Sequence, residues 1–467
     1  MNRYKKLVSD TLILGIGTFG SKLLVFLLMP FYTAWLSTSE FSTAELINAT
    51  ANLLIPLACV GIGNGIFRFA AERESDQKAV FSTSIALLGI GSAIFAVLSP
   101  LLMLIDYFDG YLWLIVCYVL SANLQSVCAQ YVRAIDRTRL FAVQGILNTA
   151  LTILCNVIFL VAFDMGVTGY VLSVIVGNLL TTLFLVILAR LWLVFDVKRI
   201  ERRLMKDLLK FSLPMVPTTV CWLLTDLSDR YMVTYFCGSD VNGVYSAAYK
   251  IPTVVNLISG IFMQAWQFSA VAESSDETTC KRFYSEVFRG FLSVIMIGTV
   301  GLILLSDFLT GLLLNTAYAD AARYMPTLLC AAALEAIVSF LATVYMVKKK
   351  SMHSFLTAMV GTLLNIVLNL ILIPRLGALG AAIATMASYG SVLIVRSVDA
   401  TRMIRFRLCL PRMILSVLLI LAASALMTAN MRGAVWWTLI PTALMFALNT
   451  PALLGSLKRL LQHRRGT

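Results

Sequence analysis

Charged residues are scarce in this sequence of 467 residues. Only 13% are Asp, Glu, Lys or Arg, against roughly a quarter in a soluble domain, and 59% are hydrophobic. A soluble chain of this length would need far more polar surface to cover its core. Apolar stretches of about 20 residues, long enough to cross about 30 Å of hydrocarbon, recur from end to end. The composition therefore predicts an all-α polytopic membrane protein without a soluble domain.

The residues that metal sites and disulfide frameworks need are also scarce. The nine cysteines are scattered without a CxxC pair, and the only two histidines, His353 and His463, lie in basic loop or terminal sequence. We therefore expect no metal site, no cofactor and no metal-dependent catalysis. The basic start of the chain leads into an apolar stretch that is too long for a signal peptide and has no small-residue cleavage site. It is expected to form the first membrane helix.

Fourteen stretches are apolar and long enough to form membrane helices. The predicted spans are 9–36, 41–67, 79–104, 111–132, 139–163, 168–193, 209–236, 241–271, 283–308, 323–347, 353–374, 377–401, 412–431 and 434–456. Basic residues cluster in the connections on the side of the two termini, whereas the opposite side has almost only Arg323, Arg375 and Arg432. By the positive-inside rule, both termini are expected in the cytoplasm. The net charge of +13 therefore indicates topology and contact with anionic lipid rather than with nucleic acid.

The two halves of the chain resemble each other. Two pairs of segments match: 35–46 with 235–246, and Asn156 followed by Gly166-Val-Thr-Gly169 with Asn369 followed by Gly377-Ala-Leu-Gly380. Matches in this order predict a parallel repeat of two six-helix lobes, with its axis along the membrane normal. The predicted domains are an N-terminal lobe at 1–194, a basic cytoplasmic linker helix at 195–208, a C-terminal lobe at 209–403, and two extra helices with a basic cytoplasmic tail at 404–467.

Ionisable side chains inside apolar spans are the candidates for function, because each must face protein or water. Lys22 lies roughly 20 Å of helix from the start of the first span, so snorkelling gives it only an incomplete escape to the interface. We interpret it as a cation that lines a cavity. Arg68, at the cytoplasmic end of the second span, fits either a substrate contact or a topology anchor. Glu45 lies one turn into the second span, nearer the outer interface, and is less informative.

The seventh span holds three charged residues, Asp226, Asp229 and Arg230. Asp226 and Arg230 are four positions apart and share a helix face, so a structural ion pair is one interpretation. The other is a binding or coupling site, to which Lys250 in the eighth span adds a second cation. Arginine offers bidentate donors that suit phosphate oxygens. Glu335, in the middle of another apolar span, is expected either to couple transport to a proton or to have a structural role.

At four places these residues are similar to a known family. The motifs are GlyIleGlyAsnGlyIlePheArgPhe at 61–69, AspArg at 229–230, GlyValTyrSerAlaAlaTyrLysIlePro at 243–252, and Gln264-Ala-Trp266. In this order and spacing they resemble the polysaccharide flippases of bacteria. These are the Wzx-like branch of the multidrug/oligosaccharidyl-lipid/polysaccharide (MOP) exporter superfamily. Length and predicted topology agree along the chain.

The resemblance implies a two-lobed helical fold around a central cavity and a function in export. Its cargo would be an isoprenoid-pyrophosphate-linked oligosaccharide, moved from the inner to the outer leaflet of the bacterial inner membrane. Family members are thought to hold the pyrophosphate with cavity cations, which map onto Lys22, Arg230 and Lys250, with Arg68 a weaker candidate. The drug-extruding branch is typified by an acidic first helix, where this sequence has Lys22. That departure favours anionic cargo.

Three other functions stay open. Lipid II export for peptidoglycan uses the same carrier lipid, drug or cation antiport is typical of the related branch, and a glycan polymerase or ligase would be a membrane enzyme. Such an enzyme generally needs a sizeable extramembrane loop or a catalytic side chain at one face, so we expect a non-enzyme. The coupling ion, H+ or Na+, is left open by the sequence. The expected partners are the lipid-linked oligosaccharide and membrane lipids, for a monomer that a glycan polymerase can join.

Overall fold

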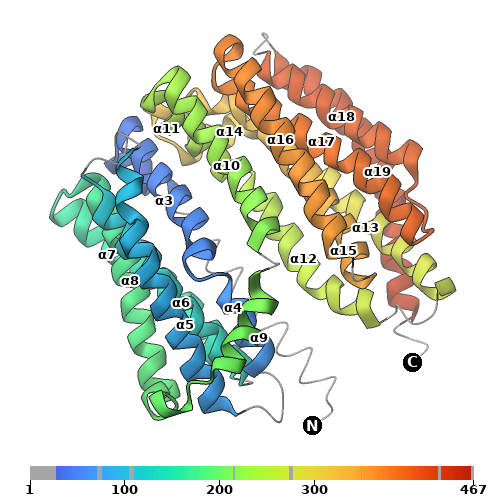
Figure 1. Ribbon diagram of the computed structural model, residues 1–467. Helices are drawn as coiled ribbons and strands as arrows, with labels where there is room; N and C mark the ends of the chain where they lie inside the picture. Colours follow the sequence, from blue (N-terminus) through green and yellow to red (C-terminus); the bar gives the residue numbers. More distant parts are fainter. Residues whose placement is uncertain are drawn as a thin grey trace. The chain divides into compact units, whose positions relative to one another are not determined.

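The computed structural model describes residues 28–70, 76–104, 110–135, 137–213, 216–272, 277–348, 350–429 and 433–463. Within these ranges every regular element is a helix (Figure 1). The chain divides into two compact units, Met1–Leu227 and Ser228–Thr467, and the division falls inside helix α10 (Val216–Cys237). The domain limits predicted from the sequence stay a prediction.

The first unit consists of helices that follow the predicted spans and the linker. They are α2 (Met29–Trp35), α3 (Thr38–Ala58), α4 (Ile62–Ala70), α5 (Gln77–Leu98) with the 3-10 turn η1 (Ser99–Leu104), α6 (Leu112–Ala134), α7 (Thr138–Asn156) continued by the π-helix η3 (Val157–Ala162), α8 (Gly166–Ala189), the short turns η4 (Leu191–Leu193) and η5 (Val197–Arg199), and α9 (Arg202–Ser212). A capping box starts α3, in which Ser37 Oγ accepts from the amide of Glu40 and a Glu40 carboxylate oxygen accepts from the amide of Ser37.

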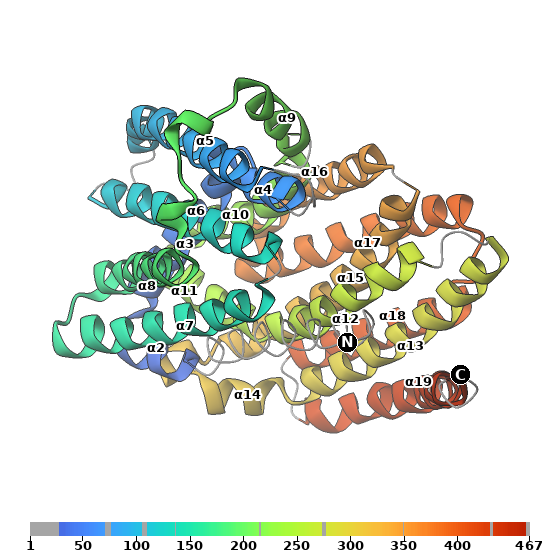
Figure 2. The ribbon, with the colours of Figure 1, turned by 90° about the horizontal axis from the view of Figure 1, so that it is seen from below.

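In its described residues, the second unit continues after α10 with nine further helices and one short turn. They are α11 (Ser239–Lys250), α12 (Thr253–Ala272), α13 (Glu277–Leu304), α14 (Ser306–Leu313), η8 (Thr316–Tyr318), α15 (Ala321–Val347), α16 (Ser351–Leu376), α17 (Ala378–Met403), α18 (Leu410–Thr428) and α19 (Ala434–His463). Helix α15 packs against α12, α13, α17 and α18 and forms the centre of this unit. Figure 2 shows α13, α18 and α19 together on one side of it.

Ten described helices are long and apolar enough to cross a membrane, and they reproduce ten of the predicted spans to within a few residues. The predicted span 9–36 lies mostly outside the described residues. The predicted span 209–236 begins in the last residues of α9 (Arg202–Ser212) and continues in α10 (Val216–Cys237), which is not one of the ten. Two others are broken helices rather than continuous ones. The span 41–67 breaks where Val60 and Gly61 adopt positive φ, and the span 241–271 breaks at Pro252, which has no amide hydrogen to continue the helix. The total of fourteen spans stays a prediction.

The outward-facing side chains of these helices are apolar. In the most apolar 18-residue stretch of α5, and in that of α7 with η3, only 17% of the residues are buried. In the corresponding stretch of α15, 83% are buried. Residues such as Val97 (78% exposed) and Ile394 (69%) would be costly in water. An apolar surface of this extent belongs in hydrocarbon, which confirms the prediction of an all-α, multi-pass membrane protein.

The glycine matches between the two halves have a structural basis. Gly166 and Gly377 both have positive φ (52° and 63°) where α8 and α17 begin. One turn later, Gly169 and Gly380 lie close to the end of the preceding helix. A Cβ on Gly169 would lie 3.1 Å from the Cβ of Phe159, and one on Gly380 would lie 2.5 Å from a carbonyl oxygen of α16. Each unit therefore has a positive-φ glycine at this turn and a glycine one turn later where the two helices lie close together.

Candidate functional site

The second unit holds a buried carboxylate, Asp229, in the middle of a polar network. Asp229 is 1% exposed. Its Oδ1 accepts from the Nδ2 atoms of Asn365 (3.1 Å) and Asn369 (2.6 Å), and its Oδ2 accepts from Tyr245 Oη (3.1 Å) and from the Thr385 hydroxyl. These donors come from α11, α16 and α17. The network therefore ties α10 to three other helices of the second unit.

The network extends beyond the carboxylate itself. Asn365 and Asn369 are four residues apart on one face of α16, and Asn369 also donates to Asn365 Oδ1 (3.1 Å). Asn365 donates to Thr385 Oγ1 (3.2 Å) and accepts from Ser228 Oγ (2.9 Å). Neutral amides and hydroxyls of this kind stabilise an ionised carboxylate. Their oxygens can also serve a hard cation such as Na+, which prefers oxygen ligands.

A chain of aromatic contacts leads from Asp229 to the neighbouring cation on α10. Tyr245, which donates to Asp229, lies 6.1 Å from Tyr249 between ring centroids. The guanidinium carbon of Arg230 lies 5.9 Å from the centre of the Tyr249 ring. Arg230 and Lys250 are both half-buried. Asp229 and Arg230 are adjacent in sequence, and each side chain meets a tyrosine of α11.

The remaining predicted site residues lie in different surroundings. Asp226 is half-buried one turn before Arg230 on α10. Glu335 is half-buried on α15, and its Oε2 accepts from Asn256 Nδ2 of α12 (2.9 Å). Arg68 is exposed in the last turn of α4. Lys22 lies outside the described residues. None of the roles predicted for these residues is tested by the geometry.

The first unit also contains a buried carboxylate. Glu45 on α3 is fully buried, and its Oε1 accepts from Tyr170 Oη of α8 (3.0 Å). The Tyr170 ring packs edge-on against Tyr32 (centroids 5.1 Å apart), and Tyr32 Oη accepts from Asn156 Nδ2 (3.0 Å). Glu45, which the sequence predicted to be less informative than the mid-span charges, is therefore part of the buried core of the first unit.

The repeat does not pair Glu45 with the buried carboxylate of the second unit. The match of 35–46 with 235–246 pairs Glu45 with Tyr245, and the second match pairs Asn156 with Asn369. In the first unit the carboxylate–tyrosine hydrogen bond joins α3 to α8, and Asn156 donates to Tyr32. In the second unit it joins α10 to α11, and Asn369 donates to the carboxylate itself. Both units therefore have a buried carboxylate with tyrosine and asparagine nearby, but at positions that the repeat does not pair.

Another buried charge missed from the sequence is Arg396 of α17, which is 2% exposed. Its guanidinium donates to Thr357 Oγ1 (2.9 Å) and to the carbonyl oxygens of Val338 (3.0 Å) and Ser354 (3.3 Å). It also lies 5.7 Å from the centre of the Tyr345 ring. These partners belong to α15 and α16, so Arg396 joins three helices and has a structural role.

The arrangement of helices is that of the MOP superfamily of transporters. The lipid II flippase MurJ in an inward closed conformation superposes with a TM-score of 0.70 at 14% identity, over 96% of this chain and 100% of that chain. An outward-facing multidrug transporter of the MATE family has a TM-score of 0.63 at 16% identity, over 85% and 95%. A MOP superfamily transporter from Pyrococcus furiosus has a TM-score of 0.61 at 14% identity, over 84% and 96%. No curated protein sequence matches the chain.

The sequence profile described as "Polysaccharide biosynthesis protein" matches residues 7–267, and the chain belongs to that family. Family and fold together confirm the prediction of a Wzx-like member of the MOP exporter superfamily. The structural neighbours named above are transporters and a flippase. The protein is therefore a multi-pass membrane protein of the polysaccharide biosynthesis family with the fold of these MOP transporters.

Proposed function

We propose that this protein is a flippase for an isoprenoid-pyrophosphate-linked oligosaccharide. In the proposal it works in the bacterial inner membrane with both termini in the cytoplasm, and a cationic cavity moves the head group by alternating access. The cations assigned to the pyrophosphate are Lys22, Arg230 and Lys250, with Arg68 as a weaker candidate. The partners are the lipid-linked oligosaccharide, the surrounding lipids and a glycan polymerase.

The observation that carries the proposal is the half-buried guanidinium of Arg230 within α10, a helix of 22 residues. A charge inside a membrane helix is expensive and marks a substrate or ion pathway. A guanidinium presents paired donors that match the oxygens of a phosphate. The centre of the Tyr249 ring lies 5.9 Å from the guanidinium carbon of Arg230. These features favour an anionic cargo over a cationic drug.

Asp229 is the residue that we assign to energy coupling. An ionised carboxylate only accepts hydrogen bonds, whereas a protonated one must donate one. Protonation would therefore force Tyr245 or Thr385 to turn its hydroxyl. Through the contact of Tyr245 with Tyr249, such a change reaches the ring that packs on Arg230. Binding of Na+ by the same oxygens would have an equivalent effect, so either ion fits the proposal.

The second candidate function is flipping of lipid II. It is favoured by the similarity to MurJ, which covers 100% of that chain. Its cargo has the same carrier lipid and pyrophosphate, so the cations assigned above would serve it equally. The polysaccharide reading takes precedence because the sequence family is that of polysaccharide biosynthesis.

The test is a flipping assay in proteoliposomes that contain a fluorescent isoprenyl-pyrophosphate oligosaccharide or fluorescent lipid II. We expect Arg230→Gln to reduce the rate at least tenfold, because it removes a bidentate phosphate contact. Arg323→Gln, which changes an exposed arginine at the start of α15, is the matched control and should transport normally. If Arg230→Gln transports as well as the control, the assigned phosphate contact is wrong. Transport of lipid II alone would favour the second candidate.

A further inference from the structure

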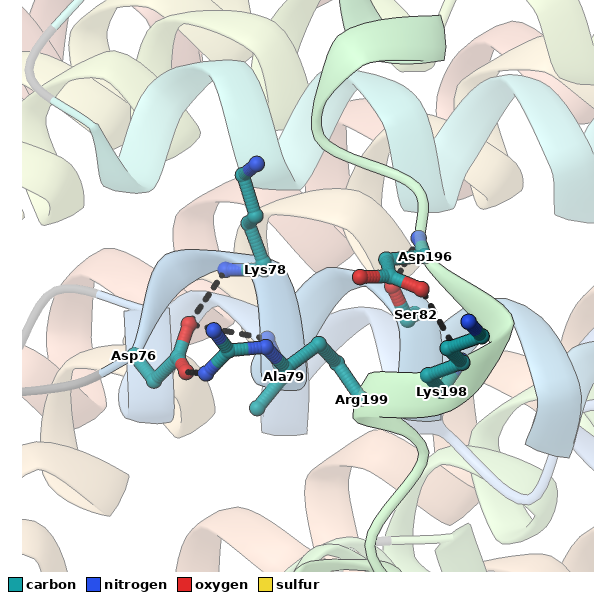
Figure 3. A network of polar contacts seen from close by, with 7 residues as sticks. All are labelled: Asp76, Lys78, Ala79, Ser82, Asp196, Lys198 and Arg199. Carbon is teal, nitrogen blue, oxygen red and sulfur yellow. Dashed lines mark hydrogen bonds and ion pairs between the residues drawn. The ribbon is translucent and has the colours of Figure 1, made fainter.

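The segment between α8 and α9 is fastened to the start of α5 (Figure 3). The amide of Asp196 donates to Ser82 Oγ (2.8 Å), and the amide of Glu201 donates to Thr83 Oγ1 (3.1 Å). Ser82 and Thr83 are fully buried. Two buried hydroxyls therefore hold the backbone of this segment at positions five residues apart. We call residues 190–210 the strap.

An ion pair adds a third attachment. Arg199 Nη1 lies 2.8 Å from Asp76 Oδ2, while Asp76 Oδ1 accepts from the amides of Lys78 (2.9 Å) and Ala79 (3.2 Å) (Figure 3). Three groups hold the pKa of the Asp76 carboxyl below its ordinary value: the backbone amide of Ala79, the backbone amide of Lys78 and the guanidinium of Arg199. Asp76 therefore stays ionised at neutral pH, and the attachment persists.

The end of the strap is fixed by close packing of α9 on α4 and α5 (Figures 1 and 2). Leu208 is fully buried in the core of the first unit. Gly65 of α4 allows this approach, since a Cβ there would lie 2.5 Å from Ser212 Oγ and 3.2 Å from a methyl carbon of Leu208. With this face of α9 fixed, its basic residues are turned outward. Arg202, Arg203, Lys206 and Lys210 are all exposed.

Large apolar side chains are exposed beside these cations. They are Trp192 (53% exposed), Leu193 (58%), Phe195 (42%) and Val197 (66%). Basic residues that only set the orientation of the membrane helices do not require exposed apolar side chains beside them. In the comparable basic segment 402–407, Arg402, Arg405 and Arg407 are exposed, but the intervening Ile404 and Phe406 are each 4% exposed. Of these two basic segments, only the strap combines exposed cations with exposed aromatic and aliphatic side chains.

We propose that the strap is a binding surface for anionic phospholipids of the leaflet that it faces. The exposed apolar side chains enter the boundary between head groups and acyl chains, and the four cations of α9 contact the phosphates. Charge complementarity selects anionic over zwitterionic lipid. Each basic side chain near an anionic surface strengthens binding about fivefold, so four cations held by one rigid element give a large preference. This surface is independent of the cations assigned to the transported pyrophosphate.

The test compares lipid retention by purified full-length proteins, measured by native mass spectrometry in detergent with added phosphatidylglycerol or phosphatidylcholine. The variant Arg202→Gln/Arg203→Gln/Lys206→Gln/Lys210→Gln should retain phosphatidylglycerol at least tenfold less well and phosphatidylcholine unchanged. The control Arg402→Gln/Arg405→Gln/Arg407→Gln should lose about twofold or less. Size-exclusion profiles and flipping rates report whether each variant is folded.

A second variant tests the apolar part of the surface. Trp192→Ser/Phe195→Ser keeps all four cations, and we expect it to lose most of the added affinity for phosphatidylglycerol as well. Equal losses in the α9 variant and the 402–407 control would mean that net charge alone selects the lipid, which overturns the proposal. A second outcome would also overturn the proposal: the α9 variant retains phosphatidylglycerol unchanged but binds an isoprenyl pyrophosphate more weakly. The strap would then contact cargo rather than lipid.

Discussion

The replacement of Asp229 by asparagine or alanine separates charge from structure at the polar network of the second unit. Asparagine has the same size and keeps one acceptor oxygen. Its NH2 group can donate hydrogen bonds to the neighbouring hydroxyl oxygens. Alanine removes all of the acceptors. If the carboxylate serves coupling, both variants lose transport, but only alanine also weakens the fold.

The size of the structural effect follows from the donors around the carboxylate. Asn365 has a second acceptor in Thr385 Oγ1, and Asn369 has one in Asn365 Oδ1. The hydroxyls of Tyr245 and Thr385 lose the Asp229 acceptor. A buried donor that loses its acceptor costs about 1–3 kcal/mol, so Asp229→Ala should cost about 2–6 kcal/mol. Asp229→Asn should cost less, because its oxygen still accepts from Asn365 and Asn369 and its NH2 group can donate to the hydroxyl oxygens of Tyr245 and Thr385.

Two measurements check these values in the same preparation. Thermal unfolding in detergent should show Asp229→Asn near the parent protein and Asp229→Ala clearly lower. The flipping assay, run with an imposed H+ or Na+ gradient, should show at least a tenfold loss for both. Asp240→Asn, an exposed acid in the first turn of α11, is the matched control. Gradient-driven transport by Asp229→Asn at half the parent rate or more would refute the coupling role.

Three further predictions concern the scaffold. Gly380→Ala should lower expression and melting temperature, because its Cβ would lie 2.5 Å from a backbone oxygen of α16, whereas Gly390→Ala in the same helix has 4.0 Å of room and should be neutral. Tyr170→Phe should cost about 1 kcal/mol in thermal unfolding, since the Glu45 carboxylate loses a donor. The pKa of Asp76 is lowered in the fold, so its contribution to stability is complete above pH 3.8 and is lost as the pH falls below it. Unfolding curves of Asp76→Asn and the parent protein should therefore converge only in that acidic range.

The span pattern could be predicted because it depends on local sequence. A run of about 20 apolar residues must cross the bilayer as a helix, whatever its neighbours are. Ten spans were located to within a few residues on that basis alone. The breaks in 41–67 and 241–271 were missed because apolar composition continues through them. A backbone turn at Val60 and Gly61 and the missing amide hydrogen of Pro252 decide those positions.

By itself, the sequence determined that this is a helical membrane protein, and it identified Asp229, Arg230 and Lys250 as charges that need a reason to lie in a span. Only the tertiary structure decided which polar side chains meet. Asn369 reaches Asp229 across 140 residues of sequence, and Tyr170 reaches Glu45 across 125. Hydropathy describes the cost of burying each group, but that cost is offset by partners on other helices. The packing of those helices, and not the composition of any one of them, supplies the partners.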